Sequence, residues 1–459
     1  MKISVIGAGY VGLTTAACLA ELGHHVFCAE ADVQKLAKLN AGELPLFEPY
    51  LDQVVARNGA AKRLAFGSTE DAIDWGLAIF ICVGTPPLEN GEADLSAIET
   101  VARTIARRAY GYRLVIEKST VPVQTGRQLR KHLSFHNANG LTYDIVSNPE
   151  FLREGSAIED FFHPDRIVVG VESQRAAEQM REIYEHVLEG SVVCPVHANC
   201  SRPKGTRFIV TDTNSAELIK HASNSFLAMK ISFVNMVADL CEAAGANIRQ
   251  VAEGVGLDPR IGSAFLQPGI GFGGFCFPKD LQAFVRIAEK FGCDFSLLKE
   301  VERINQLRVA RFVEKIEREL WVLRGKKICA WGLAFKPDTD DVRFAPAISI
   351  IRELLAEGAI VQAYDPAAME KAKNELPGVA YCRDVYEAAQ GADAIVLLTE
   401  WQEFRNVDWA RLGALVERPL VIDGRNLFSC EEVTSHGFQY LGIGGISGMP
   451  TQIGTLASV

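Results

Sequence analysis

The sequence lacks the features that mark several large classes of protein. Its longest clean apolar run, Leu77 to Val83, is far shorter than the ~18 residues that a membrane span needs. The 11 cysteines show no CxxC or Cys/His spacing, which disfavours a zinc site and a disulfide framework. Basic residues are in the minority, with Lys+Arg 47 against Asp+Glu 57 and a net charge of -10. Broad nucleic-acid binders are usually basic, so we expect no nucleic acid, membrane or metal as a partner.

We expect no secretory signal in the first residues, because Lys2 is followed by only a few apolar residues before Gly7. The number of cysteines is odd, and Cys18, Cys82 and Cys329 lie in apolar runs typical of small core residues. We therefore expect a reducing, cytoplasmic location. The 459 residues, 48% of them hydrophobic, suffice for two or three globular domains.

The N-terminal part alternates short apolar strands with helices. We expect a strand at Lys2–Ile6, a glycine turn at 7–12 and a helix at Leu13–Leu22. A second strand is expected at Val26–Ala29, and the acid Glu30 follows it. Further strands are expected at Ala78–Val83 and Leu114–Glu117. This alternation predicts a parallel sheet that helices cover on both faces.

A second copy of the pattern lies in the C-terminal part. A strand at Lys326–Trp331 again runs into a turn, and another strand is expected at Ala394–Leu398. Three residues repeat the offsets of Gly23, Val26 and Glu30, namely Gly358, Val361 and Asp365. The repeat predicts two doubly wound nucleotide-type domains in one chain.

Between these parts the sequence predicts one long helix. No proline or glycine occurs from Ser215 to Ala244, and apolar residues recur there at helical spacing. Thirty helical residues span ~45 Å. A helix with this much apolar surface must bury it against other parts of the protein. We expect it to pack on both domains and on a second subunit.

The strongest local motif is Gly7-x-Gly9-x-x-Gly12. The first glycine permits the tight turn, the second the approach of a pyrophosphate and the third close helix–sheet packing. The helix N-terminus offers N–H groups and a positive dipole to the phosphates. Glu30 is placed to accept hydrogen bonds from ribose hydroxyls, which favours NAD over a 2′-phosphorylated cofactor. In this strand–turn–helix context the motif predicts an NAD site rather than a mere glycine-rich turn.

Cys276 lies between a glycine-dense stretch at 269–274 and the pair Lys279-Asp280. Pro278 suits a first helical position, which would put Cys276 just before a helix N-terminus. There the dipole and Lys279 would lower the thiol pKa from its reference of ~8.5. Asp280 is close enough in sequence to act as an acid or base. A buried structural cysteine is the alternative, and the flanking residues favour the reactive thiol.

Three further stretches carry side chains that a reaction could use. Lys220 and Asn224 share a face of the long helix and suit a reacting alcohol and its oxyanion, although a solvated face is the alternative. The segment 148–155 holds two carboxylates, and 118–122 is a strand end whose hydroxyls could order a water or a ribose. Each is a weak signal in isolation.

Together these stretches form an ordered series of motifs. The series comprises GAGYVG at 7–12, VGTP at 83–86, KSTVPV at 118–123, NPEFLREG at 148–155, IKHASNSFLAMKISFVN at 219–235, DPRIG at 258–262, GGFCFPKD at 273–280, GLAFKPDTDDVR at 332–343 and DGRN at 423–426. The chain resembles the UDP-glucose 6-dehydrogenase family, within the wider UDP-glucose/GDP-mannose dehydrogenases, over essentially its full length.

The resemblance implies an α/β fold with two doubly wound Rossmann-like domains joined by a long central helix. It implies an N-terminal NAD-binding domain at 1–209, a central helical dimerisation domain with the cysteine loop at 210–310, and a C-terminal UDP-sugar-binding domain at 311–459. The chain would act as a homodimer or a higher homo-oligomer.

The activity implied is the conversion of UDP-glucose to UDP-glucuronate by two NAD-dependent hydride transfers, through a thiohemiacetal and a thioester on Cys276. Alternatives are the same oxidation of GDP-mannose or UDP-N-acetylmannosamine, or a two-electron hydroxyacid dehydrogenase, which needs no cysteine at 276. A non-catalytic nucleotide-sugar sensor, free to lose Cys276 or Lys220, is an alternative of another class.

The family's functional residues carry over onto positions of this chain. The catalytic set would be Cys276 as nucleophile, Lys220 with Asn224 at the oxyanion, and Asp280, Thr120 and Glu154 at the water. Cofactor contacts would come from Gly7, Gly9, Tyr10, Val11, Gly12, Glu30, Lys35, Thr85, Thr120, Glu154, Lys279 and Arg343. Substrate contacts would come from Glu150, Phe151, Leu152, Arg153, Glu154, Lys220, Asn224, Phe265, Leu266, Gln267, Pro268, Gly269, Gly273 and Lys336, with Arg260 reaching in from the neighbouring subunit.

Three positions depart from the family pattern. Phe275 replaces the usual serine before the cysteine, Gln124 replaces a usual glycine after VPV, and Phe344 replaces a usual glutamate after Arg343. None of them removes a proposed catalytic group, but Phe275 bears on the shape of the pocket and hence on the sugar.

Overall fold

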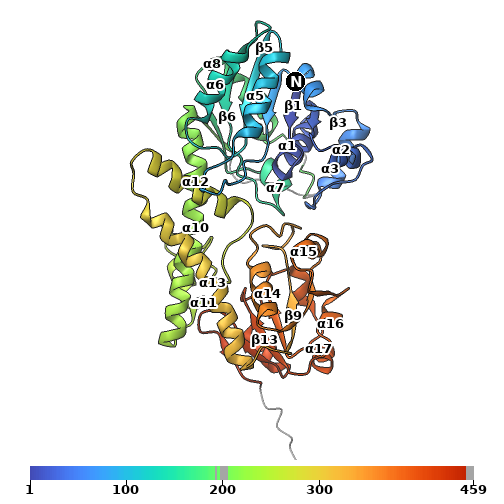
Figure 1. Cartoon of the computed structure of the whole chain (residues 1–459). Coiled ribbons are helices and arrows are strands. Elements are labelled where there is room, and N and C mark those ends of the chain that lie inside the picture. Colours follow the sequence, from blue (N-terminus) through green and yellow to red (C-terminus); the bar gives the residue numbers. More distant parts are fainter. Residues whose placement is uncertain (192–193, 197–204, 451–459) are drawn as a thin grey trace, which may run out of the picture. The chain divides into compact units, whose positions relative to one another are not determined.

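The chain folds into two compact units in a computed structural model that describes residues 1–191, 194–196 and 205–450 (Figure 1). Unit 1 comprises Met1–Ser223 and Gln282–Asp294, and unit 2 comprises Asn224–Leu281 and Phe295–Val459. The long helix α10 (Thr213–Ala244) begins in unit 1 and continues into unit 2, and α12 (Cys276–Lys290) passes from unit 2 into unit 1. The predicted long helix is therefore confirmed.

Unit 1 is built on an eight-stranded sheet with the order β3-β2-β1-β4-β5-β6-β7-β8. Its strands are β1 (Lys2–Ile6), β2 (His25–Ala29), β3 (Leu64–Gly67), β4 (Ala78–Ile81), β5 (Tyr112–Glu117), β6 (Thr142–Ser147), β7 (Arg166–Gly170) and β8 (Arg207–Thr211). Every neighbouring pair is parallel except β6 and β7. The first six strands in this order have the arrangement of a dinucleotide-binding fold.

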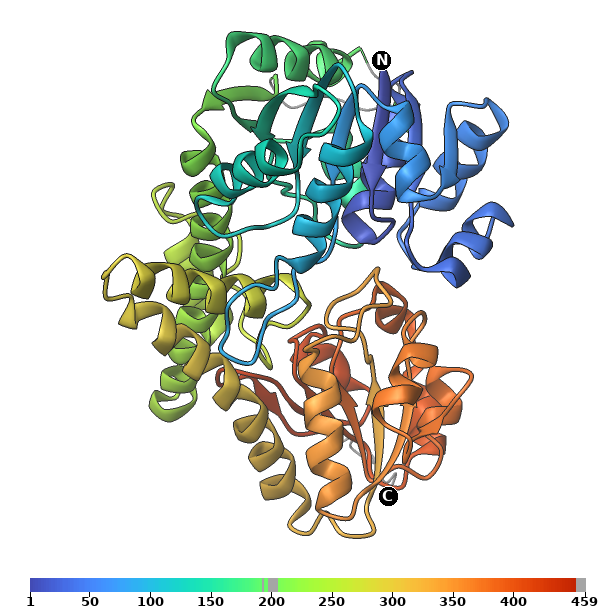
Figure 2. The same ribbon diagram turned by 45° about the horizontal axis from the view of Figure 1, so that its top comes forward.

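Helices cover both faces of this sheet (Figures 1 and 2). They are α1 (Tyr10–Glu21), α2 (Val33–Asn40), α3 (Leu51–Ala60), α4 (Thr69–Trp75), α5 (Ser96–Arg108), α6 (Thr125–His136), α7 (Ala157–Phe162), α8 (Gln174–Ile183) and α9 (Glu185–Glu189). Because strand side chains alternate, Phe80 of β4 enters one apolar core whereas Ile79 and Ile81 enter the other. A strand buried on both faces is apolar throughout, which is why the sequence predicted β4 so clearly.

Unit 2 repeats the strand order in a seven-stranded sheet, β11-β10-β9-β12-β13-β14-β15. The strands are β9 (Lys327–Trp331), β10 (Ile360–Tyr364), β11 (Ala380–Tyr381), β12 (Ala394–Leu397), β13 (Leu420–Asp423), β14 (Gln439–Leu441) and β15 (Ser447–Gly448). Its other elements are α11 (Ile248–Gly256), α13 (Ser296–Leu320), α14 (Pro346–Ala356), α15 (Met369–Glu375), α16 (Val385–Ala388), the 3-10 helix η1 (Gln402–Asn406), α17 (Trp409–Leu415) and α18 (Cys430–Ser435). The predicted second doubly wound domain is confirmed.

The first strand of each sheet ends in the same kind of glycine turn, but the acidic residues after the second strands, Glu30 and Asp365, have different surroundings. Gly7 and Gly332 both have a positive φ, +103° and +93°, after the first strand of each sheet. Glu30 is half-buried, whereas Asp365 at the equivalent offset is fully buried. The Asp365 carboxylate accepts hydrogen bonds from the backbone N–H groups of Leu333, Ala334, Ala367 and Ala368 and from the Trp401 indole. Asp365 therefore stabilises the turn at 333–334 and the loop at 367–368, whereas the Glu30 side chain is more accessible to solvent.

The helix that carries Cys276 begins earlier than the sequence predicted. Pro278 was expected at the first helical position, but α12 already starts at Cys276. A proline is tolerated there because the first four N–H groups of a helix have no intrahelical partner. Cys276 is consequently the first residue of the helix rather than the residue before it.

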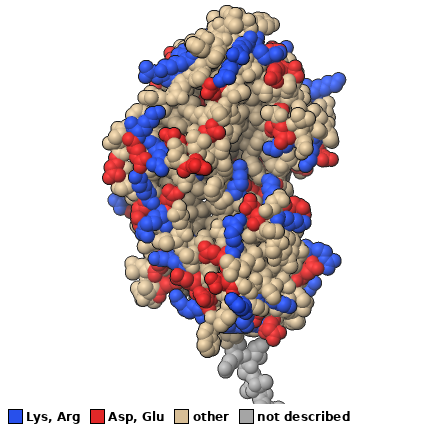
Figure 3. All heavy atoms as spheres, in the orientation of Figure 1, with Lys and Arg blue, Asp and Glu red and all other residues tan. Residues whose placement is uncertain are grey.

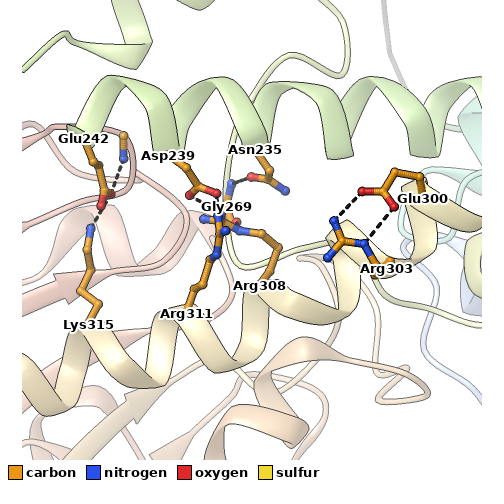
Figure 4. Close-up of polar contacts among 10 residues, drawn as sticks. Asn235, Asp239, Glu242, Gly269, Glu300, Arg303, Arg308, Arg311 and Lys315 are labelled. Atoms are coloured by element: carbon orange, nitrogen blue, oxygen red, sulfur yellow. Dashed lines mark hydrogen bonds and ion pairs between the residues drawn. The ribbon is translucent and has the colours of Figure 1, made fainter. Parts of the chain in front are cut away.

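Charged pairs join α10 to α13 within unit 2 (Figure 4). Lys315 is 2.6 Å from Glu242, and both Arg308 and Arg311 pair with Asp239. On the opposite side, large apolar side chains of α10 are exposed at a spacing of seven residues, at Phe226, Phe233 and Leu240. No helix among the described residues is long and apolar enough to cross a membrane.

A buried carboxylate of α10 binds the backbone at the start of α6 in unit 1. Glu217, 2% exposed, accepts hydrogen bonds from the N–H groups of Gln124 at 2.7 Å and Gly126 at 2.8 Å. Gln124 has a φ of +78°, a conformation that favours glycine, so this departure from the family pattern has a steric cost. Burial disfavours the charged carboxylate and raises the pKa of Glu217 to about 7.

We expect the free energy of unfolding of the wild type, relative to that of Glu217→Gln, to fall as the pH rises from 4.5 to about 7. In this range the folded protein keeps the Glu217 proton that the unfolded chain loses near 4.5. The contribution of Glu217 to the free energy of unfolding is therefore complete below 4.5 and is lost above about 7. Urea unfolding of both proteins at several pH values measures the difference, in which shared groups cancel. A difference that stays constant across this range would contradict the raised pKa.

Candidate active site

The turn after β1 has the shape that a dinucleotide needs. A Cβ at Gly7 would lie 2.7 Å from the Cys82 carbonyl oxygen, and one at Gly12 would lie 1.8 Å from that of Gly7. At Gly9, by contrast, no atom of the described residues beyond its neighbours along the chain lies within 4 Å of the Cβ position. Gly7 and Gly12 are therefore required by packing, whereas Gly9 leaves the backbone open where α1 begins at Tyr10 and Val11. The geometry fits a pyrophosphate at the helix N-terminus.

The acid at the end of β2 is held in place by the following loop. The Glu30 carboxylate accepts a hydrogen bond from the Asp32 N–H at 2.9 Å. Asp32 in turn caps α2 by accepting from the N–H groups of Gln34 and Lys35. Lys35 is exposed in the first turn of that helix. The loop therefore fixes the Glu30 carboxylate and begins the helix that carries Lys35.

The ends of β4 and β5 are bonded to each other. The buried Thr85 hydroxyl donates to the Thr120 carbonyl at 2.9 Å, and the Ser119 hydroxyl donates to the Val83 carbonyl at 2.8 Å. The motifs at 83–86 and 118–123 thus form one structure, and Thr120 is half-buried within it.

Lys220 forms a buried ion pair in unit 1. Its Nζ is 2.9 Å from Oε1 of Glu150, and the two side chains are 5% and 4% exposed. The other oxygen of Glu150 accepts the Leu152 N–H at 2.7 Å, and the Lys220 ammonium lies 5.4 Å from the Phe151 ring centroid. Asn224, one turn along α10, is also buried. The alternative of a solvated face is therefore wrong.

A second buried cation, Lys118, was not predicted as a site residue. Its Nζ is 3.3 Å from Oδ1 of Asn148, and burial lowers its pKa although the Glu150 carboxylate opposes the shift. The available signal was a lysine directly after the apolar strand β5. Lys118 therefore lies near enough to Glu150 and Lys220 to interact with both electrostatically.

The loop 148–155 is fixed at its far end by residues outside the motif. The backbone N–H groups of Gly155 and Ala157 both donate to the Glu48 carboxylate at 2.7 Å. Arg153 is exposed and forms a bidentate pair with Asp160. Glu154, between these anchors, is half-buried. Nothing in the sequence around Glu48 had indicated this role.

In unit 2 the proposed nucleophile lies beside a buried polar network. Cys276 is half-buried at the start of α12, one turn before Asp280. The Asp280 carboxylate is fully buried, pairs with the Lys279 ammonium at 2.7 Å and accepts the Asn224 amide N–H at 2.6 Å. Cys276 therefore lies at the N-terminus of a helix, one turn before a buried ion pair.

The other cysteines named from the sequence are core residues, as expected. Cys18, Cys82 and Cys329 are buried. Burial raises the pKa of each of these thiols, in the case of Cys82 to about 12. Burial therefore disfavours the thiolate form of all three. Cys200 lies outside the described residues.

The glycines before Cys276 pack against the segment that follows Arg343. The Gly274 N–H donates to the Arg343 carbonyl at 3.0 Å, and a Cβ at Gly273 would lie 2.3 Å from the Phe344 carbonyl oxygen. The Phe275 ring lies 4.4 Å from the Arg343 guanidinium carbon. The loop that carries Phe275 therefore packs against the segment that carries Phe344.

The remaining candidate residues differ in how far they are enclosed. Leu266, Pro268 and Gly269 are buried, Phe265 and Lys336 are half-buried, and Gln267 is exposed. Arg260, with a side chain 87% exposed, forms a bidentate pair with Asp258 on the surface of unit 2. Basic and acidic side chains are interspersed over the visible face of each unit (Figure 3).

Three family domains match the chain in sequence order. They are the NAD binding domain of the UDP-glucose/GDP-mannose dehydrogenase family at residues 1–188, its central domain at 214–307 and its UDP binding domain at 329–429. The second of these contains Cys276, and the third contains strands β10 to β13 and most of β9.

Curated relatives and solved structures agree with this match. The chain is 45% identical to a UDP-glucose 6-dehydrogenase of Rhizobium meliloti over 97% of this chain and 99% of that one. It is 43% identical to the UDP-glucose 6-dehydrogenase TuaD of Bacillus subtilis, over 96% and 93% of the two chains. A UDP-glucose dehydrogenase structure from Pyrobaculum islandicum matches with a TM-score of 0.85 and 38% identity, covering 94% and 95%. The chain therefore belongs to the UDP-glucose/GDP-mannose dehydrogenase family.

Proposed function

We propose that this chain oxidises UDP-glucose to UDP-glucuronate with two molecules of NAD per sugar. The names of the relatives that cover nearly the whole chain support this substrate. The structural observation that carries the proposal is Cys276 at the first residue of α12, beside the buried network of Asp280, Asn224 and Lys279. A two-electron hydroxyacid dehydrogenase has no use for such a cysteine.

NAD, when bound, supplies the hydride acceptor for each of the two oxidations at C6. The residues that would hold it are the turn at 7–12, including Tyr10 and Val11, and Glu30 at the ribose. The family resemblance adds Lys35, Thr85, Thr120, Glu154, Lys279 and Arg343. The open Cβ position at Gly9 and the anchored Glu30 carboxylate support this assignment.

The chain's own groups carry the remaining chemistry. Lys220 and Asn224, one turn apart on α10, would donate hydrogen bonds to the reacting oxygen and stabilise its negative charge. The Cys276 thiolate would add to the C6 aldehyde and hold it covalently as a thiohemiacetal, which the second oxidation makes a thioester. Water then hydrolyses the thioester, releasing the carboxylate and the thiol. Asp280, Thr120 and Glu154 would position or activate that water.

The remaining assignments concern the substrate and the assembly. Residues 150–154, 265–269, Gly273 and Lys336 would hold the nucleotide sugar, in a chain of three domains at 1–209, 210–310 and 311–459. The exposed apolar face of α10 supports a homodimer, in which the partner's Arg260 would reach the substrate. We place the enzyme in the cytoplasm.

The experiment that tests the substrate is a comparison of three nucleotide sugars. UDP-glucose, GDP-mannose and UDP-N-acetylmannosamine are each added with NAD, and NADH is followed by absorbance. We expect UDP-glucose to give the highest kcat/KM. A higher value with either other sugar would change the assigned substrate, and no NADH with any of them would favour a sensor.

We expect Glu30→Ala to weaken NAD binding about 10- to 100-fold, because a charge-assisted hydrogen bond to the ribose is lost. The protein should remain folded, since the Glu30 carboxylate lies at an accessible edge. Titration calorimetry with NAD gives the dissociation constant, and the exposed Glu43→Ala is the control. An unchanged constant for Glu30→Ala would mean that the ribose lies elsewhere.

A further inference from the structure

The segment 269–272 is buried although it belongs to no helix or strand. It directly follows 265–268, which the proposed function assigns to the nucleotide sugar. Buried backbone N–H and C=O groups need hydrogen-bond partners. Here the partners are side chains of two helices, together with a backbone carbonyl and a side chain of one turn, all within unit 2.

Gly269 is held on both sides of its backbone (Figure 4). Its N–H donates to Oδ1 of Asn235 on α10 at 2.8 Å, and its carbonyl accepts from Nε of Arg308 on α13 at 3.3 Å. Nδ2 of Asn235 is buried with no hydrogen-bond partner among the described residues. A buried unpaired donor is costly, so Asn235 is used here for its oxygen.

Phe272 is held in the same way by Asn305, one turn before Arg308 on α13. The Phe272 N–H donates to Oδ1 of Asn305 at 2.8 Å, and Nδ2 of Asn305 donates to the Phe272 carbonyl at 2.9 Å. Between these anchors Gly271 has a φ of +106°, and a Cβ there would lie 2.8 Å from Oδ1 of Asn305. The close approach of Asn305 therefore depends on glycine at 271.

The turn after β13 holds the middle of the segment. The Ile270 N–H donates to the Gly424 carbonyl at 3.1 Å, and an Arg425 N–H donates to the Gly271 carbonyl at 3.2 Å. Gly424 and Arg425 lie in the stretch that matches the family's UDP binding domain. The segment is thus bonded to that domain as well as to α10 and α13.

The charge of Arg308 is compensated although the side chain is buried. Its guanidinium pairs with the Asp239 carboxylate, which Arg311 also contacts from a more exposed position. Burial lowers the pKa of Arg308, as expected for a cation removed from water. Arg303, one turn before Gln306 and Leu307, instead forms an exposed pair with Glu300 (Figure 4).

We propose that Asn235, Asn305 and Arg308 are positioning residues for the nucleotide half of the substrate. They fix the backbone of 269–272, and with it the adjoining loop 265–268, in a conformation that is ready to bind UDP. A loop that must be ordered on binding loses affinity by the cost of that ordering. This inference rests on the proposed function, because that function assigns UDP to this loop.

The test is the affinity of the full-length protein for UDP alone, measured by titration calorimetry. Asn305→Ala removes both bonds to Phe272 and should raise the dissociation constant of UDP about tenfold. KM for UDP-glucose should rise by a similar factor, while kcat and the dissociation constant of NAD stay within about twofold of the wild type. The control is Gln306→Ala, which removes a neighbouring exposed amide that donates to Glu302 of its own helix.

A second variant, Arg308→Lys, keeps the positive charge beside Asp239 but loses the planar guanidinium that reaches Gly269. Arg308→Lys should also weaken UDP binding, whereas Gln306→Ala should not. If Asn305→Ala fails to fold, the comparison of these two variants tests the inference. Wild-type affinity for UDP in the folded variants, or an equal loss in Gln306→Ala, would overturn the inference. Failure of the proposed function looks different, because the wild type would then bind UDP without forming NADH from UDP-glucose.

Discussion

Cys276→Ala is expected to stop net formation of UDP-glucuronate, with a fall in rate of about 1,000-fold or more. The cysteine is needed only after the aldehyde forms, because it holds that aldehyde covalently for the second oxidation. Oxidation of an alcohol by NAD is reversible, so little aldehyde should accumulate in the variant. Direct hydration of the aldehyde lacks the covalent adduct and should be much slower.

The measurement is the yield of acid from UDP-glucose in the presence of excess NAD. Lys220, Asn224 and the glycine turn remain intact in the variant, so UDP and NAD should bind with wild-type affinity. Cys293→Ala is the matched control, because Cys293 is exposed beyond the end of α12. Near-normal acid formation by Cys276→Ala would exclude a thioester on this residue.

Lys220→Met is expected to lower kcat by about 100- to 1,000-fold, the usual effect of removing one donor at an oxyanion. It should also destabilise unit 1 by about 3–5 kcal/mol, because Glu150 would be left as a buried charge without its partner. The ion pair is almost completely enclosed, so solvent cannot replace the lysine.

A second substitution separates the two effects of Lys220→Met. Replacing Glu150 with glutamine in the same chain removes the unpaired charge and should recover most of the lost stability, measured by urea unfolding. It should not restore kcat. Recovery of activity along with stability would mean that Lys220 acts only through the ion pair and does not touch the reacting oxygen.

The fold was predictable because its strongest signals are local. Strands such as β4 are buried on both faces and are apolar throughout, and the turn at Gly7 requires glycine for steric reasons. The start of α12 was misplaced by two residues because a proline is tolerated anywhere in the first turn of a helix. The role of Asp365 was also hidden, since its offset alone does not distinguish a ribose-binding acid from one that bonds its own turn.

The candidate site was predictable where a motif carries the chemistry itself. The pairings of Lys220 with Glu150, and of Asp280 with Asn224 and Lys279, join residues that the motifs had already named. Supporting residues were missed, among them Lys118, Glu48 and Asn305. Glu48 and Asn305 lie far along the chain from the loops they hold, and no local pattern records a contact between distant segments. The catalytic and binding roles stay predictions until the variants are measured.

The central claim is that one active site oxidises the same carbon twice. The direct measurement is the number of NADH molecules formed per UDP-glucose consumed, with NAD in excess and the product identified by its carboxylate. The account predicts two NADH and one UDP-glucuronate for each sugar. One NADH per sugar, with an aldehyde as the product, would contradict it.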